Sequence, residues 1–200
     1  MRVAFGLKAH SGWAALVVVG LRGSEFHVID RRRIELVEDE DTPSAKQPYH
    51  AAEGLHGDTA RDVVARGVEA ARRSAVREMR AALDRSRELG HEIVACAVLV
   101  ADPMPDWSTD EILAVHFRMH KAEGVLFPDA LVRGARTCGL NAVVIPEKRL
   151  SEHAERSLAR PLNSVMKTIE TLGKSVGAPW GKDQKSAALA AMIGLHGQRE

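Results

Sequence analysis

The sequence predicts an α/β fold built on a mixed five-stranded sheet, with three antiparallel strands, then two parallel strands, and helices on both faces. Three β-rich runs joined by short turns open the chain, and connections this short join antiparallel neighbours. Two later apolar runs alternate with helical segments, and helical crossovers make the strands that they connect parallel. Of the 200 residues, 45% are hydrophobic, which is enough for one sizeable core. We therefore expect residues 1–200 to form a single domain.

The first three strands are predicted at residues 3–8, 13–20 and 25–37, arranged as an antiparallel meander. The third run loses its strict alternation at Arg31-Arg32-Arg33, which predicts a bulge or the exposed end of the strand. A polar connection follows, beginning with the acidic run Glu38-Asp39-Glu40-Asp41. We interpret this run as a solvated loop rather than a cation site.

A long helix is predicted from Asp58 to Gly90, with one apolar stripe on an otherwise charged surface. Eight arginines lie between Arg61 and Arg87, interleaved with acidic residues. Opposite charges one turn apart stabilise an exposed helix. The mixture therefore indicates a solvated face rather than a track for phosphates.

A nearly continuous apolar run predicts a buried strand at residues 92–101, and a shorter one predicts the last strand at residues 141–146. Between them, Ser108 and Glu111 have the spacing of a capping box that opens a helix.

Gly124 and Pro128 are predicted to kink or split the helix that follows Ser108, because proline removes a backbone donor. The chain then ends in two helices within residues 151–172, divided at Pro161, and in a last helix at residues 183–195.

Net charge limits the class of partner. Lys and Arg total 28 against 27 Asp and Glu, a net charge of +1 at pH 7. A strong, non-specific duplex-DNA binder carries a basic excess, because neutralisation of phosphates dominates its affinity. The balance argues against that class but leaves room for a local basic patch.

The two cysteines and the absence of long apolar runs indicate the compartment. Cys96 and Cys138 are predicted to be buried packing thiols, since no Cys or His ligand spacing accompanies them. No apolar run is long enough to span a bilayer, and the start of the chain lacks the pattern of a signal peptide. We expect a cytoplasmic protein without membrane contact.

Three segments resemble motifs of one family. The stretch Gly6–Ser11 (GLKAHS) resembles a Gly-Ile-Asp-Pro-Gly-Ser opening. Residues Lys121–Val125 (KAEGV) resemble Gln-Ala-Arg-Gly-Val, and Asp183–Ala190 resembles an alanine-rich Asp-Ala-Ala-Asp-Ala-Leu-Ala. With the order of strands and helices, these segments resemble the ribonuclease H-like superfamily and, within it, the RuvC-type Holliday-junction resolvases. The resemblance implies a ribonuclease H-like fold.

The same resemblance implies a nuclease site in which carboxylates hold two divalent metals, Mg²⁺ or Mn²⁺, that cleave a phosphodiester. Asp102 and Asp183 match two of its acids and are the candidate metal ligands. Lys8 and Ser186 stand where two further acids occur. An ammonium at position 8 repels a metal and offers it no ligand, so we predict that Lys8 replaces the cation and pairs with Asp102, Asp183 or both. Two-metal cleavage would then be lost.

A second candidate site is independent of the resemblance. His116, His120 and Glu123 lie at i, i+4 and i+7, on one face of a predicted helix. Imidazoles one turn apart can share a metal, and the carboxylate can add a ligand or act as a general base. The alternative is a half-buried helix face that packs polar side chains against a neighbour.

Titratable side chains also gather in the polar connection, at Tyr49, His50, Glu53 and His56. Loops carry function more often than frameworks do, although surface histidines without a role are common there. A meeting of both histidine groups with the Lys8 end of the sheet would favour one shared site.

The loop before the last helix carries Trp180, Lys182 and Asp183. Free backbone N–H groups at a helix start attract a phosphate, but an aspartate N-cap satisfies the same donors. We predict that Asp183 is the N-cap and that Trp180 anchors the loop.

Three functions remain open at this point. The first is a catalytically degenerate resolvase-like protein retained for nucleic-acid or protein interaction. The second is an enzyme with a re-purposed site for a phosphate-bearing substrate, built from Lys8, Asp102, His116, His120, Glu123 and Asp183. The third is a protein-interaction module without a ligand site. A homodimer is compatible with each. Mg²⁺ or Mn²⁺ is implied only for a working nuclease site, and no other cofactor is indicated.

Overall fold

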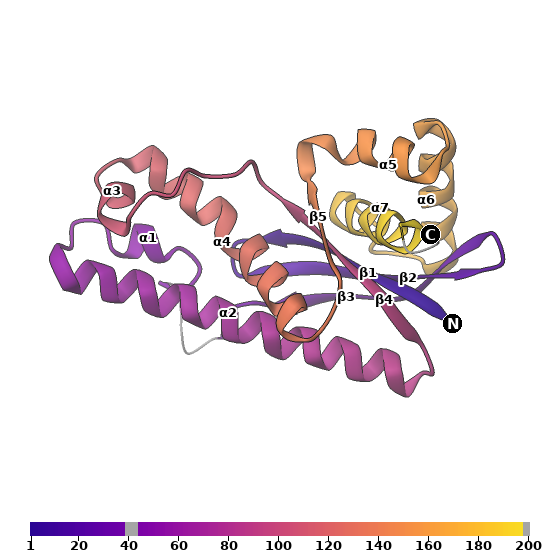
Figure 1. Cartoon of the computed structure of the whole chain (residues 1–200), viewed down its shortest axis with the longest axis horizontal. Coiled ribbons are helices and arrows are strands. Elements are labelled where there is room, and N and C mark those ends of the chain that lie inside the picture. The colour runs from indigo at the N-terminus through magenta and orange to yellow at the C-terminus, as the bar shows by residue number, and fades with distance from the viewer. Residues whose placement is uncertain (39–43, 198–200) are drawn as a thin grey trace.

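A computed structural model describes residues 1–38 and 44–197 of the chain. Five strands form one sheet in the order β3-β2-β1-β4-β5. The first three strands pair antiparallel, whereas β4 pairs parallel with β1 and with β5, which confirms the predicted mixed sheet (Figure 1). The strands are β1 (Arg2–His10), β2 (Trp13–Arg22), β3 (Glu25–Glu35), β4 (Glu92–Val100) and β5 (Ala142–Pro146).

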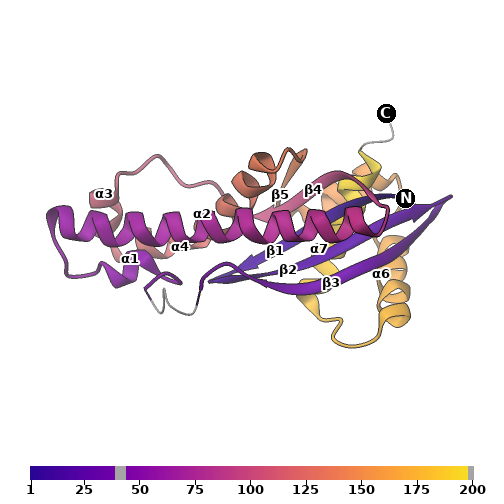
Figure 2. The ribbon, with the colours of Figure 1, turned by 90° about the horizontal axis from the view of Figure 1, so that it is seen from below.

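Helices cover both faces of the sheet. They are α1 (Pro48–Ala51), α2 (Gly57–Glu88), α3 (Thr109–Leu113), α4 (His116–Thr137), α5 (Leu150–Leu158), α6 (Leu162–Val176) and α7 (Lys182–His196). The views in Figures 1 and 2 show α2 and α4 on one face, with α7 and the α5–α6 pair on the other. None of the helices in the described part of the chain is long and apolar enough to cross a membrane.

Alternation along β1 divides its side chains between the two faces. Val3, Phe5 and Leu7 are buried in the cluster that α2 and α4 share with the sheet. Ala4 is buried on the opposite face against Leu195 of α7. The even-numbered positions of β1 therefore face α7.

Helix α7 lies directly on β1, and Gly6 permits this approach. A Cβ atom at position 6 would overlap the carbonyl oxygen of Ala187 and lie 2.7 Å from the backbone nitrogen of Ala191. Farther along α7, a Cβ at Gly194 would lie 3.4 Å from the side chains of Ala95 and Ala97 on β4. Small residues on both elements bring the two backbones close, and no bulkier side chain fits between them.

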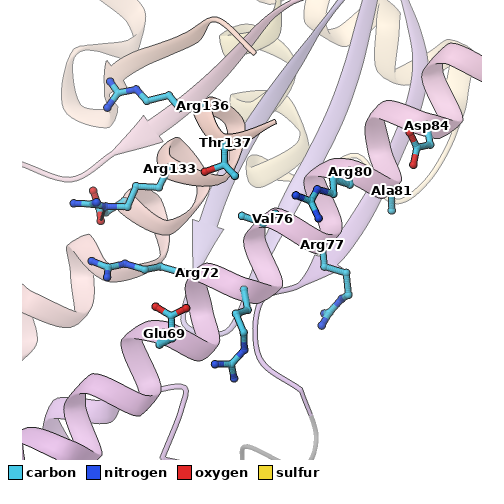
Figure 3. Close-up of a pocket in the computed structure, with 12 residues that line it drawn as sticks. Glu69, Arg72, Val76, Arg77, Arg80, Ala81, Asp84, Arg133, Arg136 and Thr137 are labelled. Carbon is cyan, nitrogen blue, oxygen red and sulfur yellow. Dashed lines mark hydrogen bonds and ion pairs between the residues drawn. The ribbon is translucent and has the colours of Figure 1, made fainter. Parts of the chain in front are cut away.

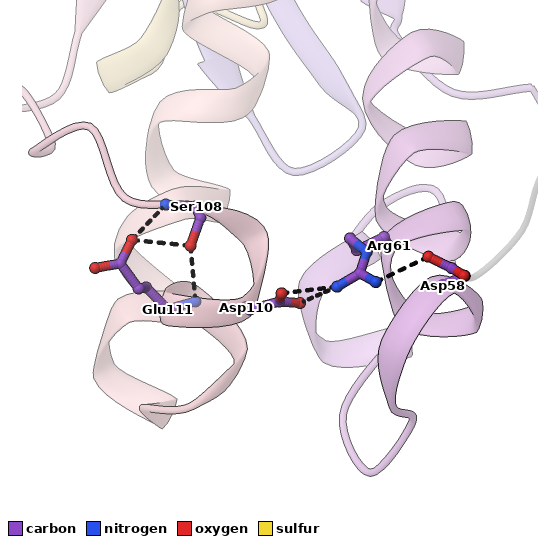
Figure 4. A network of polar contacts seen from close by, with 5 residues as sticks. All are labelled: Asp58, Arg61, Ser108, Asp110 and Glu111. Carbon is purple, nitrogen blue, oxygen red and sulfur yellow. Dashed lines mark hydrogen bonds and ion pairs between the residues drawn. The ribbon is translucent and has the colours of Figure 1, made fainter.

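The elements α1, α3 and the first turns of α2 and α4 extend beyond the end of the sheet (Figure 1). Ser108 caps α3: its hydroxyl accepts the Glu111 N–H at 3.2 Å, and the Glu111 carboxylate accepts the Ser108 N–H at 2.8 Å. This confirms the predicted capping box. The Ser108 N–H, and after it the Ser108 hydroxyl, donate to the Glu111 carboxylate and lower its pKa. Arg61 of α2 bridges Asp58 and Asp110 and so ties α3 to α2 (Figure 4).

The helix after Ser108 divides at a different place from the one predicted. Val115 is extended and separates α3 from α4, whereas α4 runs uninterrupted through Gly124 and Pro128. Proline at 128 removes the hydrogen bond to the carbonyl of residue 124, but Gly124 is exposed, so water can satisfy that carbonyl.

Helix α1 forms within a stretch that we predicted as an irregular connection, with Pro48 at its first position, where the missing N–H costs nothing. Of the thiols, Cys96 is buried, which raises its pKa to about 12, while Cys138 is only half-buried. Of the acidic run, residues 39–41 lie outside the described residues, and Glu38 pairs with Arg77.

Arg31 on β3 holds the loop that leads into α7. Its guanidinium donates to the carbonyls of Val176, Gly177 and Ala178 at 2.7–3.0 Å, and also to that of Pro179. Trp180 donates its indole N–H to Ile169 at 3.1 Å and packs on Gly173, which fits its predicted role as an anchor. The start of α7 is therefore fixed from two sides.

Replacing Gly6 with alanine tests the importance of this packing. Because the new methyl group would meet the α7 backbone, we expect Gly6→Ala to lower the free energy of unfolding by about 3 kcal/mol, the upper part of the range for overpacking. Gly124→Ala is the matched control, since no atom lies within 4 Å of its Cβ position, and in a helix it should stabilise by about 0.5–1 kcal/mol. Urea denaturation followed by circular dichroism measures both. Equal effects of the two substitutions would contradict the close approach.

Candidate functional site

The carboxyl ends of β1, β4 and β5 meet at one edge of the sheet, and Lys8 lies there. Lys8 is level with Leu99 in the parallel register, and Pro146 ends β5 opposite Val100. The Lys8 ammonium, whose side chain is 15% exposed, forms an ion pair with Glu147, directly after β5. The prediction that Lys8 pairs with Asp102 or Asp183 is wrong, because its partner, Glu147, comes from the end of β5.

Asp102 follows β4 and has a cationic partner of its own. Lys148 donates to its carboxylate at 2.5 Å. This hydrogen bond and the charge of Lys148, with a smaller contribution from Lys121, lower the pKa of Asp102, and the pKa of Lys148 rises correspondingly. Both side chains are exposed, so the pair is screened by water.

Asp183 lies over the end of β1 and faces His10. An oxygen of its carboxylate lies 3.0 Å from His10 Nε2, a close contact whose direction is not that of a full hydrogen bond. The His10 ring stacks on Trp13, with ring centroids 4.4 Å apart. The prediction that Asp183 is the N-cap of α7 is wrong, because Gly181 occupies that position. Helix α7 begins one residue before Asp183, and the Gln184 side chain accepts the N–H of Gly181 at 2.9 Å.

The histidine groups predicted separately form one cluster in the part of the molecule beyond the sheet. His116 and His120 lie on successive turns of α4, with their Nε2 atoms 3.1 Å apart. His50 of α1 stands beside them, with ring centroids 5.2 Å from His116 and 4.6 Å from His120. One ring nitrogen from each histidine lies within 4.8 Å of those of the other two.

Two carboxylates flank this imidazole cluster of His50, His116 and His120. Glu123, buried in α4, lies 2.8 Å from His50 Nδ1 and accepts the His50 backbone N–H at 3.1 Å. Glu53 lies 3.4 Å from His116 Nδ1. Burial, with a further contribution from the charge of Glu123, raises the pKa of Tyr49.

The structure therefore distributes the candidate residues over two places. Lys8, Asp102 and Asp183 lie at the end of the sheet, and His116, His120 and Glu123 lie in the imidazole cluster with His50 and Glu53. His56, which precedes α2, is exposed and belongs to neither group.

Sequence reasoning did not find a groove lined by arginines between α2 and α4 (Figure 3). It encloses about 930 Å³, and its lining has six arginines and three acids. The arginines are Arg72, Arg73, Arg77, Arg80, Arg133 and Arg136; the acids are Glu69, Asp84 and Asp129. The arginines of α2 predicted to form a solvated face line this groove together with those of α4.

The arginine groove continues into a second hollow of about 800 Å³ that reaches the ends of β4 and β5. Arg72, Asp129 and Arg133 line both hollows. The second one is mainly apolar and includes Tyr49, Met104 and Leu126. The two hollows thus run along the face of the sheet that α2 and α4 cover, as far as the ends of β4 and β5, whereas Lys8 lies on the face that α7 covers.

The Lys8–Glu147 pair can be tested by a double-mutant cycle. Glu147→Gln leaves a largely buried ammonium without its carboxylate, and we expect a loss of about 1 kcal/mol, moderated by the 37% exposure of the Glu147 side chain. Adding Lys8→Met should then cost less than it does in the wild type, because no charge remains to be paired.

The exposed pair of Asp102 and Lys148 provides the control for this cycle. Asp102→Asn with Lys148→Met should show no measurable coupling energy, because water screens this exposed pair. Strictly additive effects of Glu147→Gln and Lys8→Met in chemical denaturation would contradict a pair at the strand ends.

Comparisons with known proteins bear on the fold. No protein-family model matches the sequence, and no curated protein matches it. Two structures of RuvC from Thermus thermophilus are similar to this chain: one of RuvC, with a TM-score of 0.51 and 11% identity, and one in complex with Holliday junction substrate, with 0.52 and 10%. Each comparison covers 96% of this chain and 92% of the other. Together with the strand order, these similarities show that the chain has a RuvC-like, ribonuclease H-like fold.

Proposed function

We propose that this chain binds nucleic acid on a RuvC-like scaffold and does not cleave it by a two-metal mechanism. The ion pair between Lys8 and Glu147 is the observation that carries this proposal. It places a fixed positive charge at the first-strand position where the family resemblance calls for a metal-binding aspartate.

The surroundings of Lys8 support the same conclusion. Glu147 pairs with Lys8, Asp102 pairs with Lys148, and Asp183 faces His10. A two-metal site needs several carboxylates that converge on the ions. Within residues 1–38 and 44–197, the acids at this edge do not gather in a group of three or more whose oxygens lie within 4.8 Å of one another. The residues present therefore do not fit a pair of divalent ions, and we derive no cleavage step through them.

The arginine groove supports nucleic acid as the partner. Arginine contacts phosphate through a planar fork of donors, and a local excess of arginine attracts a polyanion even when the net charge of the chain is near zero. The groove leads toward the strand ends through Arg72 and Arg133. The fold itself accommodates branched DNA in RuvC from T. thermophilus, whose structure was solved with a Holliday junction substrate.

The two alternative functions have less support. An enzyme with a re-purposed site would need Lys8 and the imidazole cluster in one pocket, whereas their contacts lie with different partners. A protein-interaction module would explain the apolar hollow but not the arginines that outnumber acids six to three in the groove.

Binding of a labelled four-way DNA junction and a labelled duplex, measured by fluorescence anisotropy over a series of salt concentrations, tests the proposal. We expect binding at low salt, with an observed affinity that falls steeply as salt rises, because phosphate contacts release counterions. The variant Arg73→Ala/Arg136→Ala removes two groove arginines. It should bind more weakly, and the slope of log affinity against log salt should fall by about 2.

The matched control is Arg160→Ala/Lys174→Ala, which removes the same charge around α6, on the opposite side of the sheet. It should bind like the wild type. Absence of binding to both DNAs at about 50 mM salt, or equal losses in the two double variants, would refute the groove as a nucleic-acid surface.

A further inference from the structure

We propose that His50, His116 and His120 form a binding site for one divalent transition metal ion, with Zn²⁺ as the best match. The site is separate from the nucleic-acid surface proposed above, and it rests on the geometry of the imidazole cluster and of the two carboxylates beside it.

The spacing of the three imidazoles suits a metal. Zinc binds histidine nitrogens at about 2.0–2.1 Å, so tetrahedral geometry places two such nitrogens about 3.3 Å apart. The Nε2 atoms of His116 and His120 are 3.1 Å apart, already close to that value. The contributing nitrogens of all three residues lie within 4.8 Å of one another. Because His116 and His120 are exposed, small rotations of their side chains can close the remaining distance.

Two carboxylates lie close to second ring nitrogens in the cluster, where metal-binding histidines have a partner. A ligating histidine directs its second ring nitrogen at a carboxylate or carbonyl, which fixes the tautomer and makes the ligand nitrogen more basic. Here Glu123 lies 2.8 Å from Nδ1 of His50, a close contact whose direction is not that of a full hydrogen bond, and Glu53 lies 3.4 Å from Nδ1 of His116. A proton on each Nδ1 leaves the lone pairs of both Nε2 atoms free to bind a cation.

The charges around the imidazole cluster also favour a cation. Glu123 is buried, with 7% exposure, and a buried carboxylate needs a compensating positive charge. A metal held by His50 supplies that charge through the imidazole, and Glu53 adds a second negative charge. The two carboxylates, Glu123 and Glu53, together offset the positive N-terminal end of the α4 dipole, and α4 begins at His116.

The donor set selects the type of metal. Imidazole nitrogens suit zinc, copper and nickel, whereas magnesium and calcium prefer oxygen ligands. Three histidines, of which His50 is half-buried and the other two are exposed, leave a fourth position for water or for an external ligand, the arrangement found in open zinc sites. The nucleic-acid proposal requires none of these features, so each can fail without the other.

Calorimetric titration of the chelator-treated protein with ZnCl₂ tests the site, with MgCl₂ as the comparison ion. We expect one zinc ion per chain, no binding of Mg²⁺, and a rise in the melting temperature on addition of zinc. The double variant His116→Ala/His120→Ala should lower the zinc affinity more than about 100-fold, because it removes two ligands. Glu123→Gln, which keeps all three imidazoles, should lower it about 10–100-fold.

His153→Ala on α5 is the matched control, and it should bind zinc like the wild type. Melting temperatures of the metal-free proteins verify folding, and those of the double variant and the wild type should agree, since both replaced side chains are exposed. The proposal is overturned if the wild type binds no zinc at micromolar concentration. It is also overturned if the double variant, folded as judged by its metal-free melting temperature, binds zinc as tightly as the wild type.

Discussion

The close packing of α7 on β1 is the constraint on which the rest of the structure depends. It requires a residue without a side chain at Gly6, because a methyl group there would overlap the α7 backbone. With the helix held at this distance, its first turn lies over the end of β1, and Asp183 comes into contact with His10. Lys8, between Gly6 and His10 on the same face of the strand, is then covered well enough to need a partner, which Glu147 supplies. The pairing of Lys8 with Glu147 and the contact of Asp183 with His10 thus both depend on the close packing of α7 on β1.

The ion pairs at this edge, rather than the fold, determine which chemistry the edge can perform. One fold supports many functions, and function depends on the side chains at a particular site. Here Glu147 and Asp102 have lysine partners from the protein itself, and Asp183 faces His10. The histidines lie elsewhere, on α1 and on the first turns of α4, which extend beyond the sheet (Figure 1). The edge that carries Lys8 and the imidazole cluster are therefore tested by different experiments.

The sequence predicted the sheet well because its signals are local: short turns for the meander, continuous apolar runs for the parallel strands, and a capping box at Ser108. The partner of Lys8 was missed, although a signal existed. Glu147 directly follows an apolar strand parallel to β1, and the carboxyl ends of parallel strands share one edge. The joining of His50 to the α4 histidines depends on how α1 packs against α4, and the sequence pattern does not contain that information. The arginine groove was missed for the same reason, since it needs α2 and α4 side by side.

The central claim is that the edge carrying Lys8 does not support two-metal cleavage. The most direct test incubates the wild type with four-way junction, duplex and single-stranded DNA in the presence of Mg²⁺ or Mn²⁺, and resolves the products on denaturing gels. An Asp183→Asn variant prepared in the same way identifies any contaminating nuclease. We predict intact DNA under every condition. Metal-dependent cleavage by the wild type that disappears in Asp183→Asn would contradict the account.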